Sequence, residues 1–336
     1  MNANTNVFQT AMKKIVSRPE FGIILALVLM MVFFSLLSDP FLTSKNILNI
    51  IRQISFVGIL AMGMTMVLTC GDIDLSVGAV YYMSAVAMSA CLVAGAPIWL
   101  AITVGMLLGL GSGALNGFLV TQIGLPSFIG TLGTTNIIRG AALVATNGFA
   151  IALNSNTVRD PGLETFKWAA SGQAFDFIPM MAIFLAIIAV IAFIIYHKTL
   201  LGFHFRAVGS SSDAAIAAGI NTKSVRMTAF IICGLLASFG GIMMAAFLTN
   251  IQASIGSGME LSVIAPCIIG GTSISGGKGS IVGTIVGCLI VGVLSNGLIL
   301  LGVSSWWQVV IQGIIIVGAV AFDLMTQKGK GSLKAV

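Results

Sequence analysis

The chain has 336 residues, of which 57% are hydrophobic and 8% are charged, and its mean hydropathy is +1.08. A soluble domain carries about 25% charged residues, so this composition excludes a water-soluble fold. It predicts an all-α integral membrane protein that crosses the bilayer several times. The net charge of +6 does not indicate nucleic acid binding, because the cations fall at the ends of apolar segments.

Ten apolar segments are candidate membrane spans, because a hydrocarbon core about 30 Å thick requires roughly 20 apolar residues per helix. They cover 21–37, 47–69, 77–94, 98–120, 126–145, 178–196, 224–248, 260–274, 281–302 and 305–323. Several are short or rich in glycine, so some are expected to be broken or re-entrant. The first ends in Ser-Asp-Pro without a small-residue cleavage site, which indicates an uncleaved span.

Lysine and arginine predict the orientation. With the N-terminus in the cytoplasm, eleven of the 16 cations fall on the inner side and the other five on the outer side. This bias predicts that both termini are cytoplasmic. The longest inner loop is then 197–223. The longest outer loop is 146–177, whose mixed charges predict a solvated segment.

Four sequence fragments recur in the same order in the two halves of the chain. GMTMVLT (63–69) matches GIMMAAFLT (241–249), DLSV (74–77) matches ELSV (260–263), LNGFLV (115–120) matches SNGLIL (295–300), and GLPSF (124–128) matches GVSSW (302–306). The offsets of 178, 186, 180 and 178 residues predict two inverted five-helix repeats, about 21–145 and 178–323. Inverted repeats are typical of transporters whose solute path lies near the repeat interface.

Two acidic residues, Asp74 and Glu260, each stand just before a short apolar helix. Either they cap the helix start or they contact a transported solute. The topology expects Asp74 toward the cytoplasm and Glu260 toward the outside. Asp72 has no counterpart in the second half, and a solvated turn position is expected for it.

Other polar residues lie within the predicted spans. Asn116, Asn136 and Asn296 are deep in apolar segments, and Arg139 follows Asn136 by one helical turn. Such groups either form interhelical hydrogen bonds or line a polar path, and amides and hydroxyls suit a neutral, hydroxyl-rich solute. The candidate path residues are Asp74, Ser76, Asn116, Thr135, Asn136, Arg139, Glu260 and Asn296.

The chain has no nucleotide-binding loop of the GxxxxGK[ST] type. The nearest approach, SISGGKGS (273–280), has Gly279 where a magnesium-binding Ser or Thr is required. His197 and His204 have no metal-spaced partners, and the five cysteines are expected to be small buried residues. We therefore expect no catalytic residue, no metal and no cofactor bound by this chain.

The inner loop contains AVGSSSDAAIAAGINTKS (207–224). Asp213 is positioned to cap a short helix over 214–218, and Gly219 would end it. The segment is either a docking surface for a partner or an ordinary solvated connector.

Four segments together resemble the membrane permease of ribose-type monosaccharide ABC importers. They are GMTMVLTCGDIDLSVG (63–78), TLGTTNIIRG (131–140), AVGSSSDAAIAAGINTKSVR (207–226) and the GGTSISGGKGSIVGT to GVSSWWQ region (270–308). The resemblance runs from about Pro40 to Asp323. The same superfamily includes permeases for nucleosides, the autoinducer-2 signal and branched-chain amino acids.

The resemblance implies the ABC importer permease fold in one transmembrane domain of the bacterial inner membrane. It implies three kinds of partner: a cytoplasmic ATPase that binds ATP and magnesium, a periplasmic sugar-binding protein, and a second permease copy, identical or not. It also implies a coupling role for Gly209, Asp213, Ala214, Ala215, Gly219, Ile220 and Asn221. Related sequences commonly have Asn-Glu where this chain has Ser212-Asp213, and an uncharged residue at Asp72.

Two alternatives remain open at this stage. A secondary transporter driven by protons or sodium also explains inverted repeats, but the spans lack the buried acids that proton coupling usually requires. A non-transporting scaffold fits the glycine-rich packing but does not explain the repeat.

Overall fold

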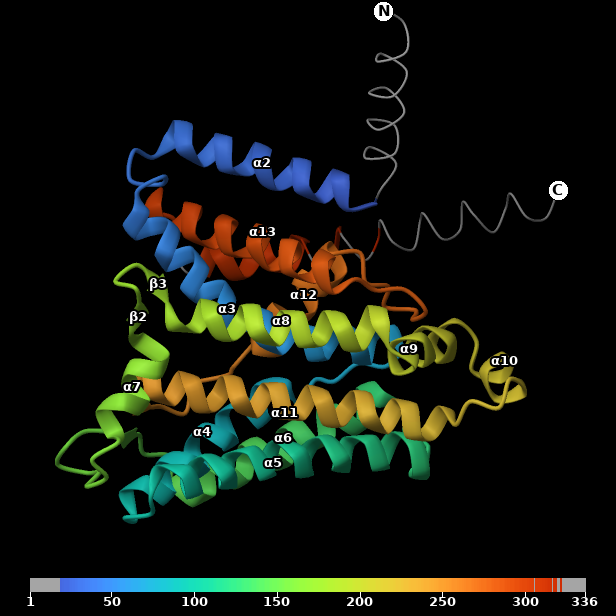
Figure 1. Ribbon diagram of the computed structural model, residues 1–336, viewed down its shortest axis with the longest axis horizontal. Coiled ribbons are helices and arrows are strands. Elements are labelled where there is room, and N and C mark those ends of the chain that lie inside the picture. Colours follow the sequence, from blue (N-terminus) through green and yellow to red (C-terminus); the bar gives the residue numbers. More distant parts are fainter. Residues whose placement is uncertain (1–18, 305, 316, 319–320, 322–336) are drawn as a thin grey trace, which may run out of the picture.

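The computed structural model describes residues 19–304, 306–315, 317–318 and 321, and these residues form a bundle of helices (Figure 1). The helices of the bundle are α2 (Pro19–Leu37), α3 (Ser44–Thr69), α4 (Val77–Val93), α5 (Ile98–Phe118) with its π-helical continuation η1 (Leu119–Ile123), α6 (Ser127–Thr146), α8 (Met180–Lys198), α11 (Thr222–Leu248), α12 (Met259–Ile269) and α13 (Ile281–Leu300). A further apolar helix covers Trp306–Ile315.

A helix is present at each of the ten predicted positions, although residues 305, 316, 319–320 and 322–323 of the last segment lie outside the described residues. Among the described residues, six helices are long and apolar enough to cross a membrane, and four apolar helices are shorter. The predicted span 260–274 is too long: α12 has 11 residues and contains Pro266. It ends at Ile269, before Gly270 and the positive-φ Gly271. At 1.5 Å per residue it is about 16 Å long, roughly half of a hydrocarbon core.

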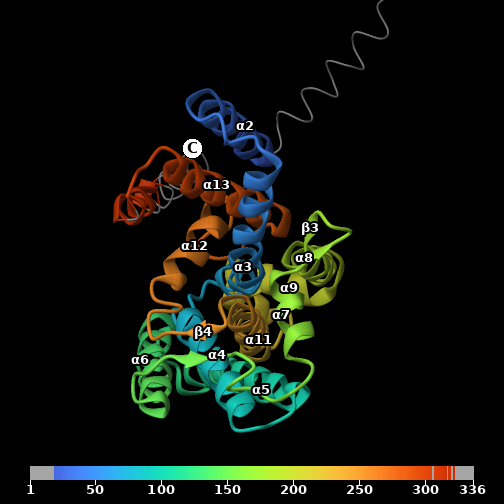
Figure 2. The same cartoon turned by 90° about the vertical axis from the view of Figure 1, so that its left-hand side faces the viewer.

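The core surrounds α3 and α11. Nearly every side chain of α3 from Ile54 to Thr69 is buried. Helix α11 packs against α3, α4 and α5, and Figure 2 shows it in the middle of these neighbours. By contrast, only Met181, Ala192 and Tyr196 of α8 are buried, as expected for a helix with one side toward lipid. A strongly apolar sequence such as that of α8 is tolerated on the surface only if the surrounding solvent is a bilayer.

Small residues bring α5 and α11 together. Gly105, Gly109 and Gly113 recur at intervals of four and lie on one face of α5. A methyl group on Gly109 would collide with the side chain of Ser238 and the carbonyl oxygen of Gly234. This close approach of two backbones through small residues is how helices associate in lipid, where there is no hydrophobic driving force between them.

Short elements cover the two ends of the bundle (Figure 1). At one end, called the α10 end, lie α9 (Leu200–Ser210) and α10 (Ser212–Ala217). At the other, called the α7 end, lie α7 (Leu163–Ser171), β2 (Gln173–Ala174) and β3 (Ile178–Pro179). Strands β2 and β3 form an antiparallel pair, with Gln173 opposite Pro179. A second antiparallel pair joins β1 (Ile151–Ala152) to β4 (Asn250–Ile251), with Ile151 opposite Ile251.

The 146–177 loop is not simply the solvated segment that its charges predicted. Arg159, Glu164 and Asp176 are exposed, and Lys167 forms an ion pair with Glu164 (2.8 Å). Asp160 is half-buried, and its carboxylate accepts hydrogen bonds from the N–H groups of Ile98 and Gly162. However, Leu163, Phe166 and Ala170 of α7 are buried, and α7 packs against α11. The loop therefore covers the bundle with an apolar face and presents only its outer face to solvent.

Candidate functional site

The connection between α3 and α4, residues 70–76, is buried although it contains two acids. Asp74 is 1% exposed. Its Oδ1 accepts hydrogen bonds from the backbone N–H (2.8 Å) and the hydroxyl (2.7 Å) of Ser76. Asp74 thus accepts from the N–H of Ser76, the residue before α4, and not from an N–H in the first turn of α4, as the predicted capping role would require. Burial raises the pKa of the Asp74 carboxyl, and the hydrogen bonds from Ser76 and Asn116 oppose this effect.

Asn116 and Thr134 extend this cluster to α5 and α6. The Asn116 amide donates to the Ser76 hydroxyl (2.7 Å) and to Asp74 Oδ1 (3.3 Å). Thr134 donates to Asn116 Oδ1 (2.6 Å). These four side chains are all buried, so in this conformation they satisfy one another and are closed to a solute.

The α3–α4 connection also has backbone contacts with α6. Thr131 Oγ1 accepts a hydrogen bond from the Leu75 N–H (3.1 Å) and lies 3.2 Å from the Ile73 carbonyl oxygen. Ser127 Oγ accepts one from the Ile73 N–H (3.2 Å). Hydroxyl groups of α6 therefore bind backbone groups of this connection and hold it in place.

Asp72 is not the solvated turn residue that the sequence suggested. It is 3% exposed and accepts two hydrogen bonds from Arg226, from Nε to Oδ2 and from Nη2 to Oδ1, each 2.6 Å. This pairing of two guanidinium nitrogens with both carboxylate oxygens is the bidentate geometry that makes arginine–carboxylate pairs strong. Arg226 compensates the buried charge, and it lies 154 residues away in the first turns of α11.

The starts of α4 and α12 lie side by side, whereas the topology expected Asp74 and Glu260 toward opposite sides. A methyl group on Gly78 would collide with the Gly256 carbonyl oxygen and come within 2.9 Å of Glu260 Oε2. Two glycines thus allow the segment before α12 to cross the first turn of α4. The half-buried Glu260 carboxylate lies over this crossing.

Three other predicted residues lie together on α6. Arg139 donates to the Ala253 carbonyl (2.6 Å) and the Ser257 hydroxyl (2.7 Å), and its guanidinium stands 5.3 Å from the centroid of the Tyr82 ring. Arg139 therefore holds the segment that leads into α12. Thr135 donates to the Thr131 carbonyl of its own helix. Asn136 is exposed and donates only to Leu132 in the same helix (3.2 Å).

Asn296 has a different environment from the other candidates. Its side-chain amide exchanges two hydrogen bonds with that of Asn46, at 2.8 and 2.9 Å. Asn46 also donates to the Phe41 carbonyl. This reciprocal pair joins α13 to the start of α3 and leaves little capacity for a solute.

The 197–223 segment, which the resemblance predicted to be a coupling loop, contains the predicted short helix with a different cap. Helix α10 begins at Ser212, and the Ser211 hydroxyl accepts a hydrogen bond from the Ala214 N–H (3.3 Å), so Ser211 is the N-cap and Asp213 lies in the first turn. Gly219 has φ +80° and ends the turn, as predicted. Asp213, Ala214, Gly219 and Asn221 are exposed, Ile220 is half-buried and Ala215 is buried. Ile216 is 58% exposed, an apolar side chain on this surface that sequence reasoning did not single out.

Gly209 places the 197–223 segment against two other segments. A methyl group on Gly209 would collide with the Thr69 carbonyl oxygen at the end of α3 and with the Gly277 N–H. Gly277 in turn donates to the Thr69 carbonyl (2.8 Å). The end of α9, the end of α3 and the 270–280 loop therefore meet backbone to backbone, which only glycine permits.

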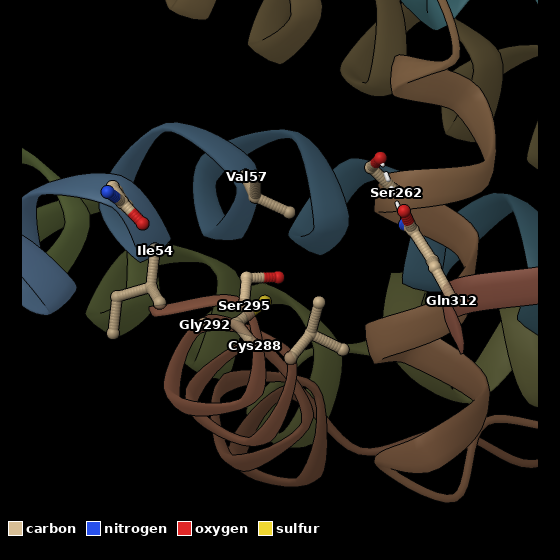
Figure 3. Close-up of a pocket in the computed structure, with 9 residues that line it drawn as sticks. Ile54, Val57, Ser262, Cys288, Gly292, Ser295 and Gln312 are labelled. Carbon is tan, nitrogen blue, oxygen red and sulfur yellow. Dashed lines mark hydrogen bonds between the residues drawn. The ribbon is translucent and has the colours of Figure 1, made fainter. Parts of the chain in front are cut away.

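A pocket of about 140 Å³ lies between α3, α12, α13 and the 306–315 helix (Figure 3). Its polar side chains are Gln53, Ser262, Ser295 and Gln312, and its apolar walls are Ile54, Val57, Cys288, Val291 and Gly292. The Gln312 amide donates to the Ser262 hydroxyl (3.0 Å) across it. No prediction from the sequence pointed to this pocket, although Ser262 and Ser295 lie in two of the recurring fragments, ELSV (260–263) and SNGLIL (295–300).

The chain matches the family described as the branched-chain amino acid transport system / permease component over residues 46–320. This chain belongs to that permease family. It is 38% identical to the ribose import permease protein RbsC of Bacillus subtilis over 306 residues, which is 90% of this chain and 92% of the relative. It is 36% identical to RbsC of Escherichia coli K12, over 89% of this chain and 92% of the relative. It is 31% identical to the L-arabinose ABC transporter permease protein AraH of Azospirillum brasilense, over 93% and 90%. No solved structure matches the chain.

The permease component of such a transport system is not itself catalytic. Among the described residues, no group of three or more His, Cys, Asp or Glu side chains could hold a metal ion. All five cysteines are free, and four are buried in the bundle, as expected for small apolar residues. What the permease offers instead is a set of buried polar contacts at helix breaks and an exposed helix at the α10 end.

Proposed function

We propose that this permease is the transmembrane subunit of an ATP-driven, binding-protein-dependent importer of a neutral monosaccharide. The observation that carries the proposal is the 38% identity with a ribose import permease over nine-tenths of the chain. The relatives described as ribose and L-arabinose permeases point to a pentose or related sugar. Amino acids, nucleosides and other polar solutes are the competing substrates that the experiment below must separate.

The polar residues suit an uncharged, hydroxylated solute. Asn136 is exposed and Thr135 is half-buried on α6, and the pocket beside α13 offers amides and hydroxyls. Within the described residues, no hydrogen bond is made by the side chains of Gln53 or Ser295, so both have capacity for a ligand. The pocket volume of about 140 Å³ compares with a cavity of about 150 Å³ that holds benzene in another protein, a size suited to part of a monosaccharide.

An inverted repeat of five plus five segments accounts for several contacts. Ser262 and Gln312 stand 186 and 178 residues after Ser76 and Thr134. In the first half, Asn116 bridges Ser76, at the start of α4, to Thr134 of α6. In the second half, Ser262 of α12 bonds directly to Gln312 of the 306–315 helix. Each pair thus links the short third helix of its half to the fifth. In addition, the second helix of each half packs against the fourth helix of the other, α3 on α13 and α11 on α5.

In this proposal, the α10 end faces the cytoplasm of a bacterial cell together with both termini. A partner ATPase that binds ATP and magnesium docks on α10, a binding protein delivers the sugar at the α7 end, and a second permease copy completes the path. ATP binding displaces α10, and the helices exchange outward and inward openings around the path. Weak contacts with the sugar favour its release, because the binding protein provides the specificity.

The test is reconstitution of the permease with the ATPase and the binding protein encoded beside it. Isothermal calorimetry on that binding protein identifies the ligand, and the radiolabelled ligand is then followed into proteoliposomes. We expect uptake of a pentose or related sugar that requires ATP inside and both partners. Uptake by the permease alone under a proton or sodium gradient would instead identify a secondary transporter, and binding of an amino acid or nucleoside would reject the sugar assignment.

A further inference from the structure

We propose that the Asp72–Arg226 ion pair transmits displacement of the coupling loop to the α3–α4 connection and from there to α6. This inference rests on the proposed function, because it requires a partner that moves the coupling loop. It assigns Asp72 and Arg226 as positioning residues that touch neither the solute nor the ATPase.

The coupling helix α10 is held on both sides by the end of α3 and the connection that follows it. On its N-terminal side, Gly209 of α9 lies against the Thr69 carbonyl. On its C-terminal side, α11 begins at Thr222, and Arg226 pairs with Asp72. The four residues from Thr69 to Asp72 therefore contact the chain before and after α10, so a force on α10 reaches them by two routes.

The two routes differ in what they can transmit. At Gly209 the contact is between backbones, which resist approach but do not pull on each other. The Gly277–Thr69 hydrogen bond joins the 270–280 loop, not α9, to the end of α3. The two-point pairing of Arg226 with Asp72 resists both separation and rotation, because Nε and Nη2 of the guanidinium and both carboxylate oxygens are engaged at 2.6 Å. Asp72 is buried, so water cannot easily replace the lost contacts if the two segments part.

Beyond Asp72, the same short segment is bonded to the helices of the candidate path. Ile73 and Leu75 are held by Ser127 and Thr131 of α6, and Asp74 is held by Ser76 and Asn116. The exposed Asn136 lies on α6 about one turn beyond Thr131. A contiguous series of contacts thus runs from α10 to α6, but contact alone does not establish energetic coupling, which must be measured.

The experiment compares sugar uptake per ATP hydrolysed in proteoliposomes that contain the complete importer. Asp72→Asn and Arg226→Gln each remove the ion pair; the first preserves side-chain size, and the second keeps a polar amide on a shorter side chain. We expect each to lower uptake per ATP by about 5- to 150-fold, the range of typical coupling energies, while ATP hydrolysis continues. The double variant should be no worse than either single variant, because residues that act as one unit are not additive.

A second variant tests the next contact without altering charge. Thr131→Val removes the hydroxyl that binds Leu75, and uptake per ATP should fall in the same range. Thr146→Val is its matched control on α6, since that hydroxyl bonds only to carbonyls of its own helix. Glu164→Gln, which breaks the exposed pair with Lys167 at the α7 end, controls for loss of an ion pair.

The outcomes are separable. Unchanged uptake per ATP in Asp72→Asn and Arg226→Gln overturns the inference while the proposed function stands. A parallel fall in uptake, ATP hydrolysis and melting temperature also overturns it, because that pattern reports stability alone. Absence of uptake by the wild-type importer overturns the proposed function and this inference with it.

Discussion

The side-chain amides of Asn46 and Asn296 exchange two hydrogen bonds across 250 residues of chain, at 2.8 and 2.9 Å. Both residues are buried. Each amide therefore supplies the donor and the acceptor that the other requires, where lipid and apolar side chains could supply neither. This pair fixes where the start of α3 meets α13, so Asn296 serves packing in this conformation.

The first prediction follows from this pair. Asn296→Leu leaves the Asn46 amide without its main partner, and the loss should destabilise the permease by about 1–2 kcal/mol. The melting temperature in detergent should fall, while uptake per folded molecule in the reconstituted importer stays near that of the wild type. The double variant Asn46→Leu/Asn296→Leu should regain part of the lost stability. A large loss of uptake without a loss of stability would place Asn296 in the solute path.

Asn136 should show the opposite pattern. It is exposed on α6 and bonds only to its own helix, so Asn136→Leu should change the melting temperature little. Uptake should decrease several-fold if this face of α6 lines the path. Comparison of transport rates with thermal unfolding of the same preparations checks this, and equal losses in both would indicate a packing role.

Ile216 on α10 is expected to be an anchor for the ATPase. Ile216→Asp places a charge on the exposed face of the coupling helix without touching the buried Ala215. If the ATPase buries Ile216 in the complex, loss of this apolar anchor should weaken assembly by about tenfold or more. Co-purification of the ATPase with the tagged permease measures this, with Ser212→Ala on the same helix as the control. Full assembly of the Ile216→Asp variant would argue against docking at α10.

The pocket beside α13 provides a fourth prediction. Gln312→Leu keeps the approximate volume but removes the amide that bridges to Ser262, so the apparent affinity for sugar during transport should fall severalfold. Protection of a cysteine placed at Ser295 from a small maleimide by excess sugar is an independent measurement. Labelling that is unaffected by sugar would show that the pocket is not on the path.

Glycine spacing on α5 allows a matched stability test. Gly109→Val would drive its side chain into Ser238 and the Gly234 carbonyl, whereas Gly111 faces open space on the same helix. Overpacking costs about 1–3 kcal/mol or more, so Gly109→Val should lower the yield and melting temperature sharply. Gly111→Val should be tolerated. Similar behaviour of the two variants would contradict the α5–α11 packing.

The sequence predicted helix positions well because each helix in lipid must satisfy its own backbone hydrogen bonds and is therefore marked by a continuous apolar run. It predicted the ends less well where a run continues beyond its helix. The run 260–274 continues beyond Ile269, for example, where Gly270 and Gly271 end the helix.

Polar partners could not be predicted in the same way. Asp72 and Arg226 are 154 residues apart, and nothing local distinguishes a buried, paired acid from a solvated one. Ser211 and Asp213 are both good N-cap residues, and the choice between them depends on where the chain turns after α9. The pocket beside α13 combines residues from four helices, so it exists only once they pack.

The β1–β4 pair has a mechanical consequence for the α7 end. Ile151 and Ala152 follow α6, the last helix of the first half, and they pair with Ile251 and Asn250, which follow α11 in the second half. A cap bonded to both halves distributes any load between them. If the binding protein settles on this surface, as proposed above, it pushes on both halves at once, and a single landing event would then synchronise their tilting without a separate signal to each.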